Sequence, residues 1–281
     1  QKEFAVPGLA LAIVKDGEVI AARGYGVREL GKPATVDAHT VFAIASNTKA
    51  FTAAALAILV DEKKLAWNDR VVERLPWFQM SDPFVTREMN VRDLLVHRSG
   101  LGLGAGDLLF WPTTSYTTEE VVRRLRFVPL ATSFRANYAY DNILYAVAGL
   151  TLEQVAGKPW PAFVQERIFV PVGMTESKTS ASDLRAGDNV AMGHAKFDFK
   201  DLRPVPPMSK VSPVNTRSAV LRHMESRVWP GVWSTVNVRP ASSRSWPSAS
   251  SSTRSGVGSY ASEQALIAPT EAPTTTSGAS A

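Results

Sequence analysis

An uninterrupted apolar run at residues 50–60 constrains the fold of this 281-residue chain more than any other feature. The run is rich in Ala and Leu, contains neither Gly nor Pro, and is followed by polar residues 61–64. Ala and Leu have high helix propensity, so the pattern predicts a helix that begins near Ser46 and ends near Lys64. Because this helix is apolar on nearly all sides, we expect it to be buried at the centre of the fold.

Ser46 and Lys49 lie at the start of this predicted helix, three positions apart. That spacing places both side chains on one helix face, within reach of each other. In a dry site the charged form of a lysine amine is disfavoured, and the neutral amine can accept a proton from a serine hydroxyl. The N–H groups of a first helical turn favour negative charge and can hold an oxyanion. Taken alone, Ser-x-x-Lys is common by chance, and a capping serine beside a solvated lysine is then the better explanation.

The composition excludes several kinds of site. The chain has no Cys, which excludes disulfides, thiol nucleophiles and cysteine metal sites. Its four histidines include no His-x-x-x-His pair, which argues against a zinc site. The longest apolar run is too short to span a bilayer, so we expect no transmembrane segment. The net charge is +5, but the whole excess follows Asp201 and no basic patch interleaved with aromatic residues occurs elsewhere, so nucleic acid is not an expected partner.

The start of the chain indicates a β-hairpin. Residues 9–14 and 19–23 are predicted strands, and Asp16-Gly17 between them is a strong signal for a two-residue hairpin turn. The first strand is a continuous apolar run, which is typical of a strand buried on both faces.

Helices are predicted in the middle of the chain. Thr117 and Glu120 form a capping box that opens a helix to about Phe127. Further helices are predicted over residues 143–157 and 160–168. Strands at the start and helices in the middle predict an α+β fold, with an antiparallel sheet flanked by helices and an all-helical region.

A second polar group, Tyr140-Asp141-Asn142, lies next to another predicted apolar helix, with Tyr140 94 residues after Ser46. A phenol near a positively charged amine loses its proton more readily, and it can relay the proton of a serine to a leaving group. An asparagine two residues later can donate to a substrate carbonyl and hold a lysine. Tyr140 is a better candidate than Tyr138 because only Tyr140 has Asn two residues later. Taken singly, a buried aromatic residue and a helix cap are the simpler explanations.

Together these segments resemble the penicilloyl serine hydrolases, specifically the group of class C β-lactamases, DD-peptidases and family VIII carboxylesterases. The resemblance runs from about Val6 to Gly193, and several ordered blocks are far more specific than one short motif. The blocks that carry it are residues 6–10, 42–49, 94–101, 140–142 and 168–174. The resemblance implies a β-lactamase/transpeptidase-like fold with no cofactor and no metal.

The resemblance also implies roles for individual residues. It implies Ser46 as the acylated nucleophile, Lys49 as its partner base, Tyr140 as general base and then acid, and Asn142 as a donor that positions the substrate. His97 matches the His-x-Ser-Gly block of the family, whose role we take as structural: the ring packs under the cleft and bonds to backbone.

One element of the family is missing from the sequence. Members carry Lys-Thr-Gly, Lys-Ser-Gly or His-x-Gly on a strand that lines the cleft opposite the serine and supplies a second oxyanion N–H. No such triplet occurs here; Arg254-Ser255-Gly256 is the nearest match, and we interpret it as a coincidence. Because losing one oxyanion donor typically slows catalysis ~10²–10³-fold, we expect slow acylation or little turnover.

The composition changes at about Ser209. Ser, Arg, Pro and Thr become frequent, Asp vanishes and the apolar periodicity fades. We therefore predict a β-lactamase-like catalytic region at residues 1–208, made of N-terminal strands and a helical subdomain, and an atypical or incomplete part at residues 209–281. Disorder, or coding DNA read in another frame, would account for that composition.

Three functions compete. A carboxylesterase is the preferred hypothesis, because β-lactams and D-Ala-D-Ala peptides carry a carboxylate that the missing Lys-Thr-Gly cation would bind. A class C-like β-lactamase or DD-peptidase is the first alternative, and an inactive truncated relative is the second. The expected partner is a small-molecule ester or β-lactam-like substrate, and the sequence does not indicate an oligomeric state.

The family resemblance implies a periplasmic or secreted location, with a cytoplasmic one as the alternative. Residue 1 is Gln and not Met, so we expect a starting segment, with any export signal, to precede the sequence.

Overall fold

The computed structural model describes most of the chain before residue 218. The described residues are 5–110, 114–180, 183–184, 187–197, 201–205 and 216–217. All of them belong to one compact unit, residues 1–230. Apart from Thr216–Arg217, the part predicted to be atypical lies outside the described residues, as does Arg254-Ser255-Gly256.

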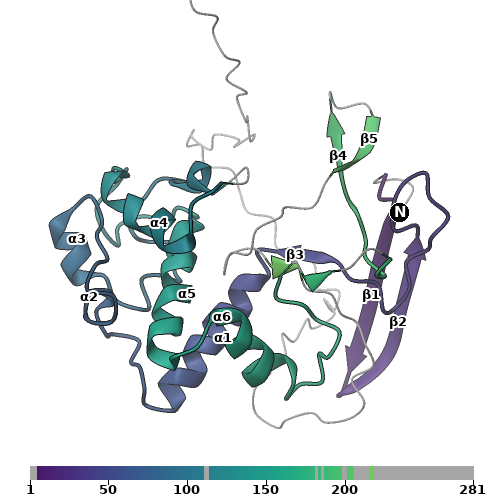
Figure 1. Ribbon diagram of the computed structural model, residues 1–281, viewed down its shortest axis with the longest axis horizontal. Coiled ribbons are helices and arrows are strands. Elements are labelled where there is room, and N and C mark those ends of the chain that lie inside the picture. The colour runs from purple at the N-terminus through teal and green to yellow at the C-terminus, as the bar shows by residue number, and fades with distance from the viewer. Residues whose placement is uncertain are drawn as a thin grey trace, which may run out of the picture. The chain divides into compact units, whose positions relative to one another are not determined.

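The predicted hairpin is present as β1 (Gly8–Lys15) and β2 (Glu18–Gly26), which pair antiparallel (Figure 1). Its two-residue turn has positive φ at both positions, 52° at Asp16 and 82° at Gly17. Such a turn matches the right-handed twist of the strands it joins, and Gly adopts positive φ without strain. The Asp-Gly signal therefore located the turn.

The prediction that the first strand is buried on both faces is wrong. Leu11 and Val14 of β1 are 42% and 55% exposed. Among the described residues, β1 and β2 form a sheet of their own, without a third strand. A continuous apolar run reports which residues could be buried, but the neighbours that would cover them are set by the tertiary structure.

The helix predicted over residues 46–64 is present as α1 (Thr48–Asp61), and it is shorter at both ends. Strand β3 (Ala43–Ala45) ends directly before Ser46, and Ala45 has a φ of 44°. The chain therefore turns through Ser46 and Asn47 before the helix begins. At the other end, Lys63 has a φ of 59°, which stops the helix in the left-handed manner usual at a C-terminus.

α1 is buried along one face only, whereas the prediction has it buried on nearly all sides. Its buried side chains lie along one face, at Thr48, Lys49, Thr52, Ala55, Leu56 and Leu59. Ala50 and Ala54 are exposed. Alanine contributes apolar character to the sequence pattern with little side-chain area, so the run overstates how much of the helix is covered.

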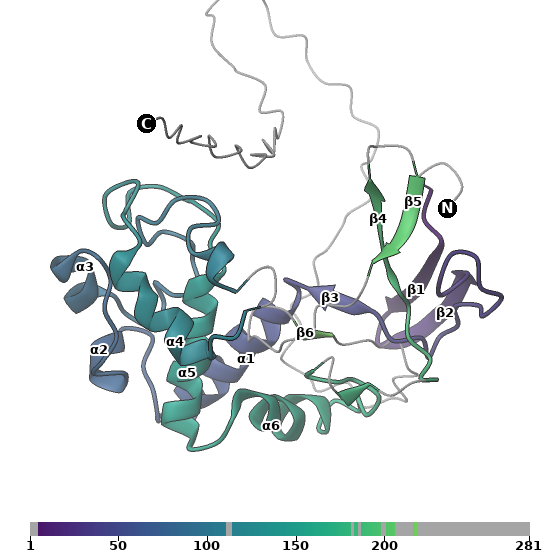
Figure 2. The same cartoon turned by 45° about the horizontal axis from the view of Figure 1, so that its top comes forward.

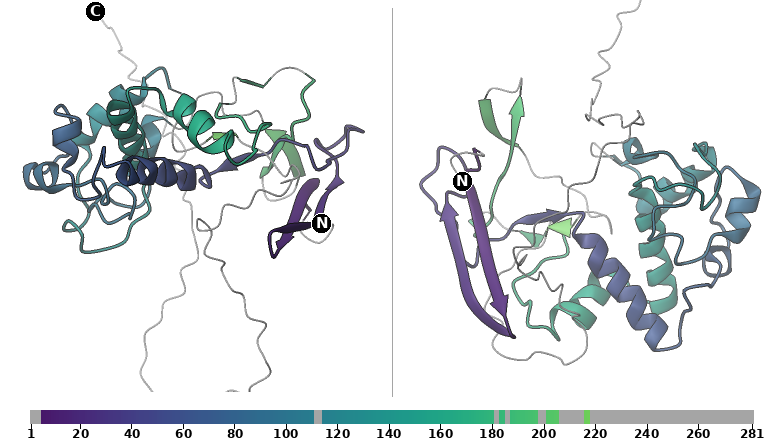
Figure 3. Two further views of the ribbon diagram at one scale, coloured as in Figure 1. Left: turned by 90° about the horizontal axis from the view of Figure 1, so that it is seen from below. Right: turned by 180° about the vertical axis from the view of Figure 1, so that it is seen from behind.

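The core of the helical region surrounds α5 (Ile143–Ala156), whose residues 143–149 are all buried. This helix contacts α1, α2 (Val71–Arg74), α4 (Thr118–Arg123) and α6 (Trp160–Val164), and it lies beside α1 in every view (Figures 2 and 3). It ends at Gly157, which has a φ of 66°. The prediction of a helix over residues 143–157 is thus confirmed.

The remaining helices are short. The capping box at Thr117 and Glu120 opens α4 as predicted, and a 3₁₀ turn, η2 (Arg124–Phe127), continues it. A π-helical turn, η3 (Gln165–Phe169), continues α6 in the same way and completes the helix predicted over residues 160–168. The other two elements are α3 (Pro83–Glu88) and the 3₁₀ turn η1 (Asp107–Leu109).

The other strands also pair antiparallel. β3 pairs with β6 (Thr216–Arg217), and β4 (Gly193–Phe197) pairs with β5 (Asp201–Val205). The described residues thus form small antiparallel sheets together with a helical region, which confirms the α+β prediction. β3 is followed by α1 after a two-residue turn, and this turn at the junction of sheet and helices carries Ser46.

Candidate active site

Ser46 lies at this junction, on the turn between β3 and α1, where it is exposed. Lys49 is one helical turn away on the first turn of α1, and only 7% of it is exposed. The Lys49 Nζ donates to Ser46 Oγ at 3.0 Å. The two side chains are thus close together, as predicted, and Ser46 lies just before the first residue of the helix.

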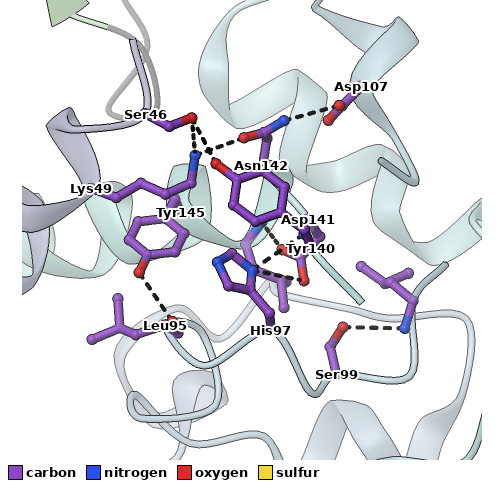
Figure 4. A network of polar contacts seen from close by, with 12 residues as sticks. Ser46, Lys49, Leu95, His97, Ser99, Asp107, Tyr140, Asp141, Asn142 and Tyr145 are labelled. Carbon is purple, nitrogen blue, oxygen red and sulfur yellow. Dashed lines mark hydrogen bonds and ion pairs between the residues drawn. The ribbon is translucent and has the colours of Figure 1, made fainter. Parts of the chain in front are cut away.

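Tyr140 reaches the same hydroxyl from the loop that precedes α5. Its Oη lies 2.6 Å from Ser46 Oγ, and the two groups can share a proton (Figure 4). The backbone oxygen of Tyr140 accepts from the N–H of Gly104 at 2.9 Å, so the glycine-rich loop holds this segment in place. Ser46 Oγ therefore contacts both an amine and a phenol, as the sequence hypothesis requires.

Asn142 completes this group of four residues. Its Oδ1 accepts from Lys49 Nζ at 2.7 Å, and its Nδ2 donates to Asp107 Oδ2 at 2.9 Å. The side chain of Asn142 does not cap α5, because the neighbouring Asp141 Oδ1 accepts from the N–H of Leu144 at 3.3 Å instead. Asn142 thus occupies the N-cap position of α5 without a side-chain capping bond, and its amide bridges Lys49 and Asp107.

Asp107 is a residue of the site that sequence reasoning missed. It follows directly after the glycines of residues 100–106, and Gly106 has a φ of 84°. This left-handed backbone conformation favours glycine, and Gly106 lies against Ile143, where a Cβ would be 2.9 Å from the end of that side chain. Burial raises the pKa of Asp107, although its hydrogen bond from Asn142 opposes the shift. An acidic residue directly after a glycine run was the available signal.

Tyr145 is a second residue that sequence reasoning did not place in the site. Its ring lies under Lys49, with the Nζ 5.2 Å from the ring centroid, while the Tyr140 ring lies 4.8 Å away. The Tyr145 hydroxyl donates to the backbone oxygen of Leu95 at 3.0 Å. Burial raises the pKa of Tyr145 to about 12, so this phenol remains a neutral donor near pH 7.

His97 has the surroundings that its predicted structural role requires. Its Nδ1 accepts from the backbone N–H of Asp141 at 3.2 Å, and its ring packs on Tyr140 with centroids 4.5 Å apart. Tyr138, the alternative to Tyr140, is 68% exposed and makes a T-shaped ring contact with His97 instead. The structure thus places Tyr140 at Ser46, and Tyr138 beside His97.

The described part of the chain contains no group of three or more His, Asp or Glu side chains that could hold a metal ion. No helix within it is long and apolar enough to cross a membrane.

Residues 1–237 match the family model described as "Beta-lactamase". The chain belongs to the beta-lactamase family. This match, together with the relatives below, confirms the resemblance to the penicilloyl serine hydrolases and assigns the fold as β-lactamase/transpeptidase-like.

Three similar proteins show the range of the family. Unguisins hydrolase ungD of Aspergillus violaceofuscus is 32% identical over 217 residues, which cover 72% of this chain and 37% of that protein. The octameric penicillin-binding protein homologue from Pyrococcus abyssi is 26% identical with a TM-score of 0.67, covering 77% of this chain and 51% of the other. EstCE1, a hydrolase with promiscuous acyltransferase activity, is 25% identical with a TM-score of 0.64, and the match covers 73% of this chain and 56% of EstCE1. The chain thus spans about half of these relatives or less.

Proposed function

We propose that the chain is a serine hydrolase that cleaves carboxylic esters through an acyl-enzyme on Ser46. The observation that carries this proposal is the pair of contacts to Ser46 Oγ, from Lys49 Nζ at 3.0 Å and from Tyr140 Oη at 2.6 Å. A hydroxyl held between an amine and a phenol, which together can take its proton, has the geometry of an activated nucleophile.

In the proposed reaction, Ser46 Oγ attacks the carbonyl carbon of the ester. Its proton passes to Tyr140, with Lys49 as partner base, and the carbonyl oxygen becomes an oxyanion. The bond to the alcohol oxygen then breaks as Tyr140 returns the proton to that oxygen. A water molecule attacks the acyl-enzyme in the same manner and releases the acid. Asn142 Nδ2 donates one hydrogen to Asp107, and its second hydrogen can position the substrate carbonyl.

The preference for esters follows from the missing third motif. β-Lactams and D-Ala-D-Ala peptides carry a carboxylate, and the sequence lacks the Lys-Thr-Gly, Lys-Ser-Gly or His-x-Gly triplet that lines the cleft in family members. A neutral ester does not need such a cation. Slow turnover stays a prediction: a site without this second oxyanion donor would work ~10²–10³-fold more slowly.

Hydrolysis of p-nitrophenyl butyrate by the full chain tests the proposal. Ser46→Ala should abolish hydrolysis, whereas Ser133→Ala, at an exposed serine in a loop, should leave it unchanged. Hydrolysis that survives Ser46→Ala would rule out the proposed nucleophile.

A penicillin-binding activity is the second candidate, and the likeness to the penicillin-binding protein homologue from Pyrococcus abyssi supports it. Intact-protein mass spectrometry separates the candidates after exposure to a fluorophosphonate and, in a second sample, to a penicillin. A fluorophosphonate adduct alone supports the esterase, and a penicillin adduct on Ser46 supports the alternative. If neither adduct forms, the result supports the inactive relative.

We also propose the division into a catalytic region at residues 1–208 and an atypical part at residues 209–281, on the change in composition near Ser209. The periplasmic or secreted location rests on the family resemblance alone and stays a prediction.

A further inference from the structure

The amine of Lys49 has contacts of two kinds. It donates to the Ser46 hydroxyl and to the Asn142 amide oxygen, which uses two of its three N–H groups. It also lies over the rings of Tyr140 and Tyr145, at 4.8 Å and 5.2 Å from their centroids. Both distances are within the range of about 6 Å over which a ring face attracts a cation.

The two rings differ in what their hydroxyls do. The Tyr140 hydroxyl reaches Ser46 and belongs to the proposed chemistry. The Tyr145 hydroxyl points away from Ser46 and donates to the Leu95 backbone oxygen at 3.0 Å (Figure 4). Tyr145 comes from the first turn of α5 and is 6% exposed, so its ring is fixed by packing as well as by this bond. Its contact with Lys49 is therefore made by the ring face.

We propose that Tyr145 is a positioning residue whose ring face holds the Lys49 ammonium in reach of Ser46 and Asn142. The inference rests on the proposed function of Ser46 and Lys49, and it adds a residue that neither the Ser-x-x-Lys nor the Tyr-x-Asn pattern contains. Tyr145 touches no reacting atom and acts through Lys49.

The contact between the Tyr145 ring and Lys49 also affects the transfer of the Ser46 proton. A ring quadrupole attracts the ammonium form of Lys49 and does not attract the neutral amine in the same way. The contact therefore holds the Lys49 ammonium in place while Tyr140 takes the serine's proton. The charge of Lys49 stabilises Tyr140 in its phenolate form, and this oxygen, 2.6 Å from Ser46 Oγ, takes the serine's proton and becomes the phenol.

The rate at which a fluorophosphonate labels Ser46 in the full chain tests this role. Tyr145→Phe keeps the ring and removes only the bond to Leu95, whereas Tyr145→Leu removes the ring. We expect Tyr145→Phe to label at close to the wild-type rate and Tyr145→Leu to label about 2- to 30-fold more slowly, which is the range of a cation–π contact converted into a rate. Tyr138→Leu is the matched control, because Tyr138 contacts His97 but not Lys49.

A fluorinated series keeps the test independent of folding. Phenylalanine carrying one, two or three ring fluorines at position 145 preserves the shape of the ring while weakening its attraction for a cation. The labelling rate should fall stepwise with each fluorine. An unchanged rate across the series, or a Tyr145→Phe variant as slow as Tyr145→Leu, would overturn the inference. Failure of the proposed function has a different signature, because the wild-type chain would then not be labelled at Ser46.

Discussion

Tyr140→Phe is the sharpest test of the proposed chemistry. The change removes one oxygen, the Oη that lies 2.6 Å from Ser46 Oγ, and keeps the ring that packs on His97 and Lys49. Lys49 Nζ, at 3.0 Å, then remains as the neighbour of the serine hydroxyl.

The expected loss follows from the role of the removed group. A positioned general acid or base contributes ~10²–10⁴-fold, so kcat should fall by that factor, equivalent to about 3–5 kcal/mol of barrier. The KM should stay near its wild-type value, because the phenol acts on the transition state and the substrate contacts remain. Stability should change by no more than about 0.5–1.5 kcal/mol, the usual net value of one hydrogen bond.

The assay is steady-state hydrolysis of p-nitrophenyl butyrate, with urea unfolding of each variant in parallel. Tyr138→Phe is the matched control, since Tyr138 packs on the same histidine but is 68% exposed and does not reach Ser46. A kcat for Tyr140→Phe within tenfold of wild type would refute the reasoning and leave Lys49 as the sole base.

Three further predictions concern stability. Burial raises the pKa of Asp107, so the stability that it contributes is present below the ordinary pKa of 3.8 and is lost as pH rises through the folded value. In urea unfolding, the free energy of unfolding of Asp107→Asn should therefore rise relative to that of wild type as pH rises. A difference that stays constant with pH would contradict this. The pKa of Tyr145 rises from 10.0 to about 12, so wild type should lose stability between those pH values and Tyr145→Phe should lose less. Urea unfolding at alkaline pH measures both. Parallel curves of unfolding free energy against pH would disprove the prediction. Leu56→Ala, at a side chain with no exposed area, should lower the unfolding free energy by about 2–5 kcal/mol. Ala54→Ser, on the exposed side of α1, should change it by no more than about 0.5 kcal/mol. Equal losses in the two variants would show that Leu56 does not lie on the core face of α1.

Local sequence signals determined much of the fold and part of the site. Asp16-Gly17 located the hairpin turn, and Thr117 with Glu120 located the start of α4. Ser46 and Lys49 were placed together because three residues of chain limit their separation. In each case the interaction joins residues a few positions apart, so short-range geometry alone decides it.

Long-range packing decided the rest. The start of α1 depends on how β3 ends at Ala45, and the exposure of the hairpin depends on which strands pair with it. The contacts of Tyr140 with Ser46, and of Tyr145 with Lys49, each join segments more than ninety residues apart. Sequence spacing carries no information on such distances, because they follow from how α1 and α5 pack in three dimensions.

Asp107 illustrates the same division within a single residue. The glycine run before it was visible in the sequence, and so was the acidic side chain that follows. Its bond to the Asn142 amide appears only once Gly106 lies against Ile143 and brings the loop onto α5. The sequence by itself thus determined the chemical groups and their local geometry, whereas the tertiary structure decided which of those groups meet at Ser46.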